Sequence, residues 1–326
     1  MRPVADRSNR FPLTLVIHGG AGNITRDNMT PELERRYRSG LEQALKEGYR
    51  VLSSGGSSVE AVVAAIKVME DSPWFNAGKG AVFTRNGTVE LDASLMDGRI
   101  GMAGAVAGVK TIKNPIVAAH RIMTHSPYVM LIANGAEEFA RNEGLAMVVP
   151  EYFHTRRQLE RLRKLRANPD KTSKNQAPIL PDSPFFGDDK LGTVGAVALD
   201  RLGNIAAGTS TGGTVGKRYG RVGDSAVIGA GTYADNDTCG ISATGHGEYF
   251  IRNVVAYDIA ARMKYRGQSL VDAAREVIGK HLKKIGGNGG VIGLDRQGNI
   301  MMEFNTPGMY RGFIREEGKP RVSFYD

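Results

Sequence analysis

The chain has 326 residues, of which 41% are hydrophobic, and its formal net charge is +9. This length and composition allow a large buried core in one or two domains. No run approaches the roughly 20 apolar residues that a membrane-spanning helix needs, and the single cysteine, Cys239, excludes an intrachain disulfide and a cysteine-based metal site. Because Met1 to Arg10 is polar and no apolar segment follows it, we expect no signal peptide and a cytoplasmic protein.

The positive charge is concentrated between Thr155 and Lys174, where eight basic residues stand against Glu160 and Asp170. Such a stretch is typical of a solvated helix that runs into a flexible linker. It also permits a second hypothesis, a basic nucleic-acid-binding protein, whose affinity would depend on residues 155–174 and fall with salt. The stretch lacks the interleaved aromatic residues of single-strand binders, and no nucleic-acid fold signature accompanies it.

The first predicted elements are a strand and a helix. Leu13 to Ile17 is an apolar run that predicts a buried strand, and His18 to Gly22 (HGGAG) predicts a tight loop after it. Thr30 followed by Pro31 is a helix start signal, and the glycine pair at 55–56 ends the helical pattern.

A second helix and a hairpin follow. Ser57 and Glu60 form a capping-box pattern that predicts a helix through about Met69. Val82 to Leu91 is predicted to form a β-hairpin that turns on Asn86 and Gly87.

Next come a strand, a helix and a linker. Ala103 to Val109 reads as an apolar strand, and Pro115 starts a helix through about His125. After Asn168 the periodicity is lost, and prolines prevent regular structure up to Lys190.

The last third alternates strands and helices. Two hairpins resemble each other, one from Val194 to Ala207 and one from Val291 to Phe304. Between them, Glu248 to about Tyr265 and Ser269 to about Ile285 carry helical apolar spacing. The residue pattern as a whole indicates a layered α+β protein with mostly antiparallel sheet.

The segment Gly192 to Asp200 (GTVGAVALD) begins a new apolar strand, with Thr193 as its second residue. A threonine hydroxyl is a poor nucleophile near neutral pH. Cleavage of the Gly192–Thr193 bond would place it beside a free α-amine, with a pKa of roughly 7.7 to 8.0, that can act as its base. β-Propensity alone also explains a threonine at this position, so the motif needs support from its context.

A competing hypothesis is a serine hydrolase. Gly208 to Gly212 (GTSTG) matches the nucleophile elbow around Ser210, the HGGAG segment is similar to an esterase oxyanion loop, and His246 or His281 follows downstream. An elbow requires a turn from strand to helix. The closely spaced glycines after Ser210 do not support a helix, which disfavours this hypothesis.

Six segments provide the context, and their order and spacing are more specific than any one of them. They are Val16 to Gly22 (VIHGGAG), Phe75 to Phe83 (FNAGKGAVF), Gly192 to Gly213 (GTVGAVALDRLGNIAAGTSTGG), Gly220 to Asp224 (GRVGD), Ala243 to Glu248 (ATGHGE) and Asn305 to Tyr310 (NTPGMY). With them the chain resembles, over nearly its whole length, the plant-type L-asparaginase and isoaspartyl peptidase family of N-terminal nucleophile hydrolases.

The resemblance implies a four-layer αββα sandwich with two antiparallel-rich sheets between helical layers. It implies one domain over residues 1–326, self-cleaved between Gly192 and Thr193 into an α subunit (1–192) and a β subunit (193–326). A flexible basic linker at about 155–190 would end the α subunit. We expect the mature protein to be a dimer of such αβ heterodimers, without a nucleic-acid or membrane partner.

The resemblance also implies the catalytic residues. Thr193 would be the nucleophile, and Thr211 the second threonine, which tunes its hydroxyl and amine. Thr244 and Gly245 would form the oxyanion hole, and the side-chain amide of Asn76 would support the site. Taken alone, these residues are also explained as ordinary strand or turn residues.

Binding residues follow from the same resemblance. Arg221 would hold the α-carboxylate of the substrate bidentately and Asp224 its α-ammonium, whereas without the resemblance a surface ion pair explains both residues. His246 either faces the pocket or is a structural histidine. No cofactor is required for the chemistry. A structural sodium ion is implied on backbone carbonyls of Met69, Glu70, Ser72, Phe75, Ala77 and Lys79.

The expected function is a self-processing amidohydrolase that cleaves β-aspartyl (isoaspartyl) dipeptides and L-asparagine and releases L-aspartate through a threonine acyl-enzyme. A glycosylasparaginase shares this logic but cleaves sugar–asparagine links, and the lack of a signal peptide disfavours it.

Overall fold

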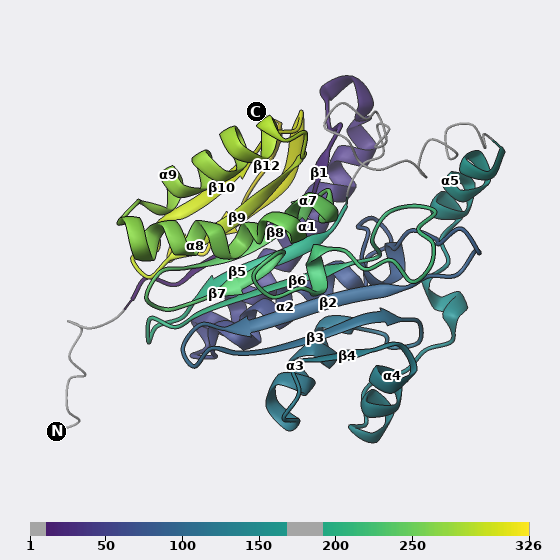
Figure 1. Cartoon of the computed structure of the whole chain (residues 1–326), viewed down its shortest axis with the longest axis horizontal. Coiled ribbons are helices and arrows are strands. Elements are labelled where there is room, and N and C mark those ends of the chain that lie inside the picture. The colour runs from purple at the N-terminus through teal and green to yellow at the C-terminus, as the bar shows by residue number, and fades with distance from the viewer. Residues whose placement is uncertain (1–10, 168–191, 326) are drawn as a thin grey trace.

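The computed structural model describes residues 11–167 and 192–325. Within these ranges two sheets stack face to face and helices cover both outer faces (Figure 1). This arrangement is the αββα sandwich that the resemblance implied. Among the described residues, no helix combines the length and the apolar character needed to cross a membrane.

The larger sheet carries the candidate site. Its strands follow one another in the order β12 (Arg321–Tyr325), β11 (Gly308–Ile314), β1 (Thr14–Gly22), β5 (Val194–Leu199), β6 (Ile205–Thr211), β2 (Leu91–Asp97), β3 (Met102–Val109) and β4 (Met130–Ile132). All neighbours pair antiparallel except β3 and β4, which are parallel.

The smaller sheet is antiparallel throughout. Its order is β10 (Ile300–Phe304), β9 (Gly289–Asp295), β8 (Cys239–Gly245) and β7 (Thr232–Ala234). Apolar side chains fill the space between the two sheets, among them Val16, Val197, Ile205, Ile292 and Leu294. Burial of this apolar surface holds the two sheets together.

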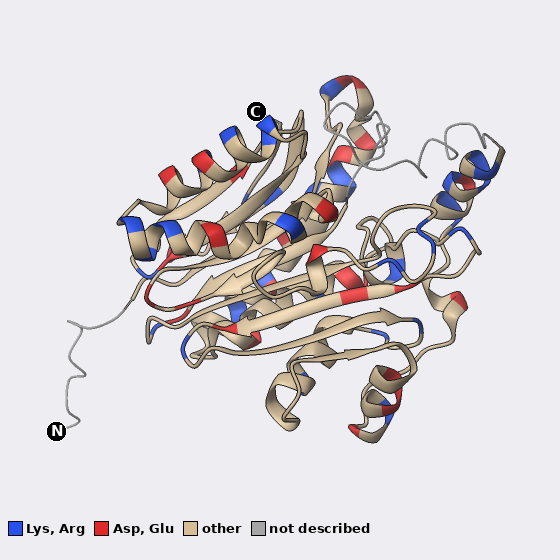
Figure 2. Ribbon diagram, in the orientation of Figure 1, with Lys and Arg blue, Asp and Glu red and all other residues tan. Residues whose placement is uncertain are grey.

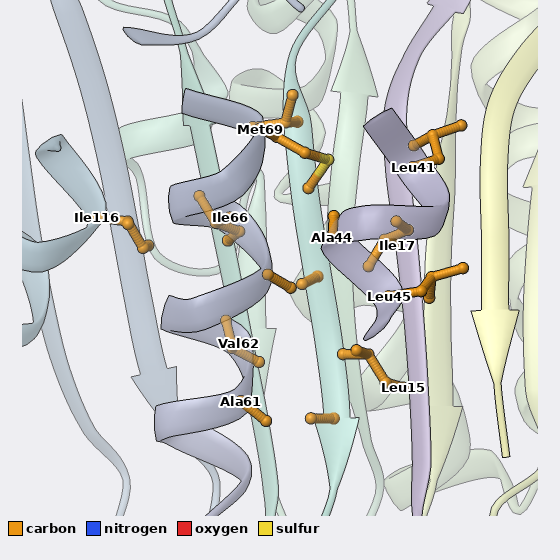
Figure 3. Close-up of a cluster of buried hydrophobic side chains, with 14 of the residues drawn as sticks. Leu15, Ile17, Leu41, Ala44, Leu45, Ala61, Val62, Ile66, Met69 and Ile116 are labelled. Atoms are coloured by element: carbon orange, nitrogen blue, oxygen red, sulfur yellow. The ribbon is translucent and has the colours of Figure 1, made fainter. Parts of the chain in front are cut away.

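Helices α1 (Pro31–Ser53), α2 (Ser58–Glu70) and α3 (Pro115–His125) cover the outer face of the larger sheet. Figure 3 shows Leu41 and Leu45 of α1 and Ile66 of α2 in the same cluster as side chains of β1. The predicted start signals are confirmed. The Thr30 side chain accepts a hydrogen bond from the Leu33 N–H, and both bonds of the Ser57–Glu60 capping box form.

The outer face of the smaller sheet is covered by α7 (Gly247–Asn253), α8 (Val255–Arg266), α9 (Leu270–Ala274) and the π-helix η7 (Arg275–Leu282). The prediction of a single helix from Glu248 to Tyr265 is wrong, because Val254 adopts a left-handed conformation (φ 47°) and separates α7 from α8. The cause is tertiary. The N–H groups of Ala256 and Tyr257 donate to the carbonyls of Ala230 and Gly229 instead of continuing α7.

The basic stretch begins as helix α5 (Arg156–Ala167), where Figure 2 shows Lys and Arg gathered. This helix is attached to the body of the protein, because Gln158 and Leu162 are buried and Arg157 donates to the Tyr37 hydroxyl. Through residue 167, therefore, the predicted linker is a packed helix. The remainder of the predicted linker, 168–190, lies outside the described residues.

Two other local predictions need correction. His18 to Gly22 belongs to β1 instead of a loop, because Gly20 and Ala21 pair with β11 after a bulge. Within the predicted hairpin from Val82 to Leu91, the strands are reduced to one bridge, between Phe83 and Val89. The remaining elements are α4 (Ala133–Asn142) and the short helices η2 (Arg26–Asn28), η3 (Gly78–Gly80), η4 (Pro150–Phe153) and η6 (Asp224–Ala226).

Candidate active site

The β5–β6 hairpin brings the two predicted threonines together. Val194 pairs with Ser210 across the hairpin, so Thr193, just before β5, lies beside Thr211 at the end of β6. The Thr193 hydroxyl donates a hydrogen bond of 2.9 Å to the Thr211 hydroxyl, and both residues are buried. The hydroxyl of the predicted nucleophile and that of the predicted second threonine are therefore in direct contact.

A small recess opens beside this pair. It is lined by most of the predicted catalytic and substrate-binding residues, but not by Thr244 or Asn76. Its lining consists of Gly192, Thr193, Thr211, Gly213, Thr214, Arg221, Gly223, Asp224, Ser225 and Gly245.

Two buried oxygen atoms at this site have no hydrogen-bond partner among the described residues. They are Oγ1 of Thr244, which precedes the recess residue Gly245, and Oδ2 of Asp224. Buried polar atoms are almost always hydrogen-bonded, because an unsatisfied one costs about 1–3 kcal/mol. A negatively charged oxygen could accept the hydrogen of the Thr244 hydroxyl, and an ammonium group could donate to Oδ2 of Asp224.

The charged residues of the recess form a network. Burial raises the pKa of Asp224 to about 7, against the opposing influence of Arg221. Arg221 is itself bound by Glu248, with Nε to Oε1 at 2.9 Å and Nη2 to Oε2 at 3.0 Å. Sequence reasoning missed Glu248, although the quoted segment ATGHGE ends on it.

Asn76 forms hydrogen bonds with residues that line the recess, including Gly192 at the predicted cleavage site. Its backbone N–H donates to the Gly192 carbonyl at 3.0 Å, and its side-chain amide donates to the Gly213 carbonyl at 2.8 Å. A Cβ atom on Gly192 would lie 2.8 Å from the Cβ of Asn76. The backbone can come this close to Asn76 only because residue 192 is glycine.

His18 is a second residue that sequence reasoning did not place in this site. Its Nδ1 lies 3.1 Å from the Thr193 carbonyl oxygen and its Nε2 lies 3.0 Å from Oγ of Ser242, which links β1, β5 and β8. Burial lowers the pKa of His18 to about 3, so the ring is neutral near pH 7. A Cβ atom on Gly195 would lie 1.9 Å from the Ser242 hydroxyl, which explains that glycine.

The serine-hydrolase arrangement is not formed. Ser210 lies inside β6, and its hydroxyl donates to Oε1 of the buried Glu70 at 2.6 Å. The predicted absence of a helix directly after this segment is confirmed, since the next element is the three-residue η6. His246 is buried at the N-terminal end of α7, and burial lowers its pKa to about 4.

The six residues with predicted sodium-binding carbonyls lie at the end of α2 (Met69 and Glu70) and in the loop that follows α2. This loop is folded tightly upon itself, because a Cβ atom on Gly78 would lie 2.2 Å from the Glu70 carbonyl oxygen and one on Gly80 would lie 2.0 Å from that of Phe75. The Met69 and Ala77 carbonyls accept N–H groups of the same loop. Carbonyl oxygens are suitable ligands for a hard cation, and the sodium site stays a prediction.

Comparison with known proteins gives one consistent family. The family described as asparaginase (Asparaginase_2) matches residues 11–324. An isoaspartyl peptidase of Salmonella typhimurium is 45% identical over 311 residues, covering 95% of this chain and 98% of that protein. One of Escherichia coli is 47% identical over 313 residues, covering 95% of each. A probable isoaspartyl peptidase/L-asparaginase 2 of Arabidopsis thaliana is 38% identical over 330 residues, covering 96% and 98%.

The family match runs over both sheets and covers every residue that lines the recess. The matches agree with the resemblance that the six sequence segments indicated. The chain therefore belongs to the asparaginase family, whose members here include isoaspartyl peptidases and L-asparaginases.

Proposed function

We propose that this protein is a self-cleaving threonine hydrolase that releases L-aspartate from β-aspartyl dipeptides and from L-asparagine. The observation that carries the proposal is the contact of the Thr193 and Thr211 hydroxyls at 2.9 Å, at the mouth of a recess that holds Arg221 and Asp224. The names of the similar proteins support the substrate class.

Cleavage of the chain would come first. The Thr193 hydroxyl oxygen adds to the Gly192 carbonyl carbon, the C–N bond breaks, and the Thr193 nitrogen leaves with the proton. The negative charge develops on the Gly192 oxygen, which accepts the Asn76 N–H. Breaking the C–N bond frees the Thr193 amine, and water then hydrolyses the resulting ester, which gives a carboxyl group on Gly192 and restores the Thr193 hydroxyl. Cleavage would give an α subunit of residues 1–192 and a β subunit of residues 193–326.

Substrate hydrolysis would use the same hydroxyl. The free amine takes the hydroxyl proton, and the oxygen attacks the side-chain carbonyl carbon of the substrate. The Thr244 hydroxyl and the Gly245 N–H would hold the oxyanion, and losing one such donor typically costs about 2.7–4 kcal/mol of barrier. Ammonia or the second amino acid leaves with the proton, and water cleaves the acyl ester.

The substrate's α-groups would be held apart from the reacting carbonyl. Arg221 binds the α-carboxylate and Asp224 the α-ammonium, so the side-chain carbonyl is directed at Thr193. We also propose a structural sodium ion on carbonyls of residues 69–79, a dimer of αβ heterodimers and a cytoplasmic location. Atomic emission, light scattering and cell fractionation measure these three properties.

The test combines intact-mass analysis, N-terminal sequencing and hydrolysis of a β-aspartyl dipeptide. We expect the wild type to show a new N-terminus at Thr193 and to release aspartate. Thr193→Ala should remain a single chain without activity, whereas the matched hydroxyl variant Ser210→Ala should cleave and turn over. A new terminus elsewhere, or an active Thr193→Ala, would overturn the proposal. A glycosyl-asparagine in the same assay tests the glycosylasparaginase alternative.

A further inference from the structure

We propose that Glu248 is a positioning residue that holds one edge of the Arg221 guanidinium, so that its other edge faces the recess and receives the substrate's α-carboxylate. This inference rests on the proposed function and concerns the same site. It assigns to Glu248 the selectivity for substrates that carry this carboxylate.

The contact between the two side chains leaves half of the guanidinium available. Glu248 accepts from Nε at 2.9 Å and from Nη2 at 3.0 Å, which is a bidentate pair along one edge. Arginine has five N–H donors, so this pair uses two of them. Both hydrogens of Nη1 and the second hydrogen of Nη2 remain for another carboxylate.

The free end of Arg221 lies at the recess. A Cβ atom on Gly223 would be 3.0 Å from Nη1, and one on Gly213 would be 3.4 Å from it. Both glycines line the recess together with Thr193. A carboxylate bound at Nη1 would therefore lie inside the recess and near the nucleophile.

Gly247 explains how Glu248 reaches this position. A Cβ atom on Gly247 would lie 2.8 Å from Nη2 of Arg221 and 2.9 Å from Oδ1 of Asp224. Because glycine has no Cβ, the start of α7 approaches both side chains closely. The next residue, Glu248, then lies beside Arg221.

The surroundings favour an anionic Glu248. Burial alone would raise its pKa, but the hydrogen bonds and charge of Arg221 outweigh burial and lower that pKa. The two side chains are 32% and 19% exposed, so solvent screens their pair only in part. Asp224, which lines the recess and whose charge also acts on Arg221, is the carboxylate needed for the substrate's ammonium.

This last point distinguishes positioning from ordinary stabilisation. If Glu248 is removed, Arg221 is free to turn toward Asp224. The clamp, which is the pair Arg221 and Asp224, would then hold both the α-carboxylate and the α-ammonium of the substrate more weakly. A purely structural ion pair would instead affect every substrate alike. A Glu248 that competes with the substrate for Arg221 would hinder binding, so its removal would improve binding.

The test uses the cleaved full-length protein and the variants Glu248→Gln and Glu248→Asp. The control is Glu316→Gln. It breaks another bidentate pair, between Glu316 and Arg201, and neither of these residues lines the recess. The kinetic parameters are compared for a β-aspartyl dipeptide and for the same dipeptide in which the α-carboxylate of the aspartyl residue is converted to the amide. Calorimetric binding of L-aspartate reads the clamp without turnover.

We expect Glu248→Gln to lower kcat/KM for the carboxylate substrate about tenfold or more, mainly through KM, because a misaligned guanidinium loses its bidentate contact with the substrate carboxylate. The amide substrate should change less than about twofold, Glu248→Asp should fall between Gln and wild type, and Glu316→Gln should match wild type. L-Aspartate binding should weaken in parallel with KM. In an Arg221→Lys background, which should still cleave at Thr193, Glu248→Gln should add little.

An equal loss on both substrates, no loss, or tighter binding in Glu248→Gln would overturn the proposal. Failure of the proposed function gives a different result. In that case the wild type itself does not hydrolyse the β-aspartyl dipeptide, and aspartate binding alone decides the role of Glu248.

Discussion

Two β-hairpins of this protein have turns with the same hydrogen bonds, but their strands lie in different surroundings. In β5–β6 the turn runs from Asp200 to Asn204, and in β9–β10 from Asp295 to Asn299. In each, the Asp side chain accepts the N–H groups two and four residues later, and the Asp N–H donates to the Asn carbonyl. The sequence D-R-x-G-N therefore forms the same turn in both sheets.

The strands around those turns have different surroundings. β5 and β6 lie within the eight-stranded sheet with every residue buried, whereas β10 is the edge strand of the smaller sheet and is half-exposed. β6 ends in three hydroxyl residues. Thr209 contacts Ser242, Ser210 donates to Glu70, and Thr211 accepts from Thr193. β10 carries methionines instead. Local sequence thus decides the turn, and position in the sandwich decides which hairpin can support chemistry.

The strongest test of this difference is the acid sensitivity caused by His18, which binds the Thr193 carbonyl in the first hairpin. Its folded-state pKa, about 3, lies below the ordinary value of 6.5. The unfolded chain therefore binds the extra proton between these values, and stability falls as pH drops. The loss is about 1.4 kcal/mol per pH unit, about 5 kcal/mol in all.

Urea unfolding of the uncleaved Thr193→Ala chain at several pH values measures this slope. His18→Gln should be less stable at pH 7 and should lack this component of the slope. The exposed-histidine variant His125→Gln should keep it. An unchanged slope in His18→Gln would contradict the assignment.

The next largest effect concerns Thr211, the last residue of β6. Thr211→Val keeps the shape but removes the hydroxyl that accepts from Thr193. We expect kcat to fall about a hundredfold or more, as for loss of a group that assists proton transfer. Thermal melting should show a folded protein. In the second hairpin, Met302→Leu should leave kcat at the wild-type value, and a Thr211→Val enzyme with normal kcat would remove Thr211 from the mechanism.

A smaller effect is expected in the pH profile. Asp224 has a pKa of about 7, with Arg221, Glu248 and Asp92 as the charges that act on it. In the proposed mechanism it must be ionised to bind the substrate ammonium. Below about pH 7, kcat/KM should therefore lose an extra factor of about ten per pH unit, beyond the loss caused by protonation of the Thr193 amine. A substrate without the α-amino group should lack this extra loss. Equal profiles for both substrates would contradict the role of Asp224.

The smallest effect tests the shared turns directly. Asp200→Ala and Asp295→Ala each remove two side-chain bonds to backbone N–H groups, at about 1 kcal/mol per bond. Each Asp has a third bond as well: Asp200 accepts the buried Ser58 N–H at the start of α2, and Asp295 accepts the part-buried side-chain amide of Asn299 in its own turn. Because an unpaired buried N–H costs more, we expect Asp200→Ala to destabilise more. Chemical unfolding of both variants gives the two values. A larger loss in Asp295→Ala would show that the turns are not equivalent.

Much of the architecture could be predicted from local signals. The helix starts at Thr30 and Ser57, the start of α3 at Pro115 and both D-R-x-G-N hairpins were predicted correctly, because each depends on hydrogen bonds between neighbours in the chain. The break at Val254 and the extension of β1 through Gly22 were missed. Both result from backbone groups that bond to distant segments, Ala230 and β11.

The sequence by itself determined the family, the nucleophile hypothesis at Thr193 and the candidate clamp of Arg221 and Asp224. Only the tertiary structure decided which groups complete the site. His18 contacts Thr193, which lies 175 positions away in the chain, and Glu248 contacts Arg221, which lies 27 positions away. No periodicity links residues so far apart, because their contact is set by how the sheets and α7 pack, and packing depends on all the elements at once.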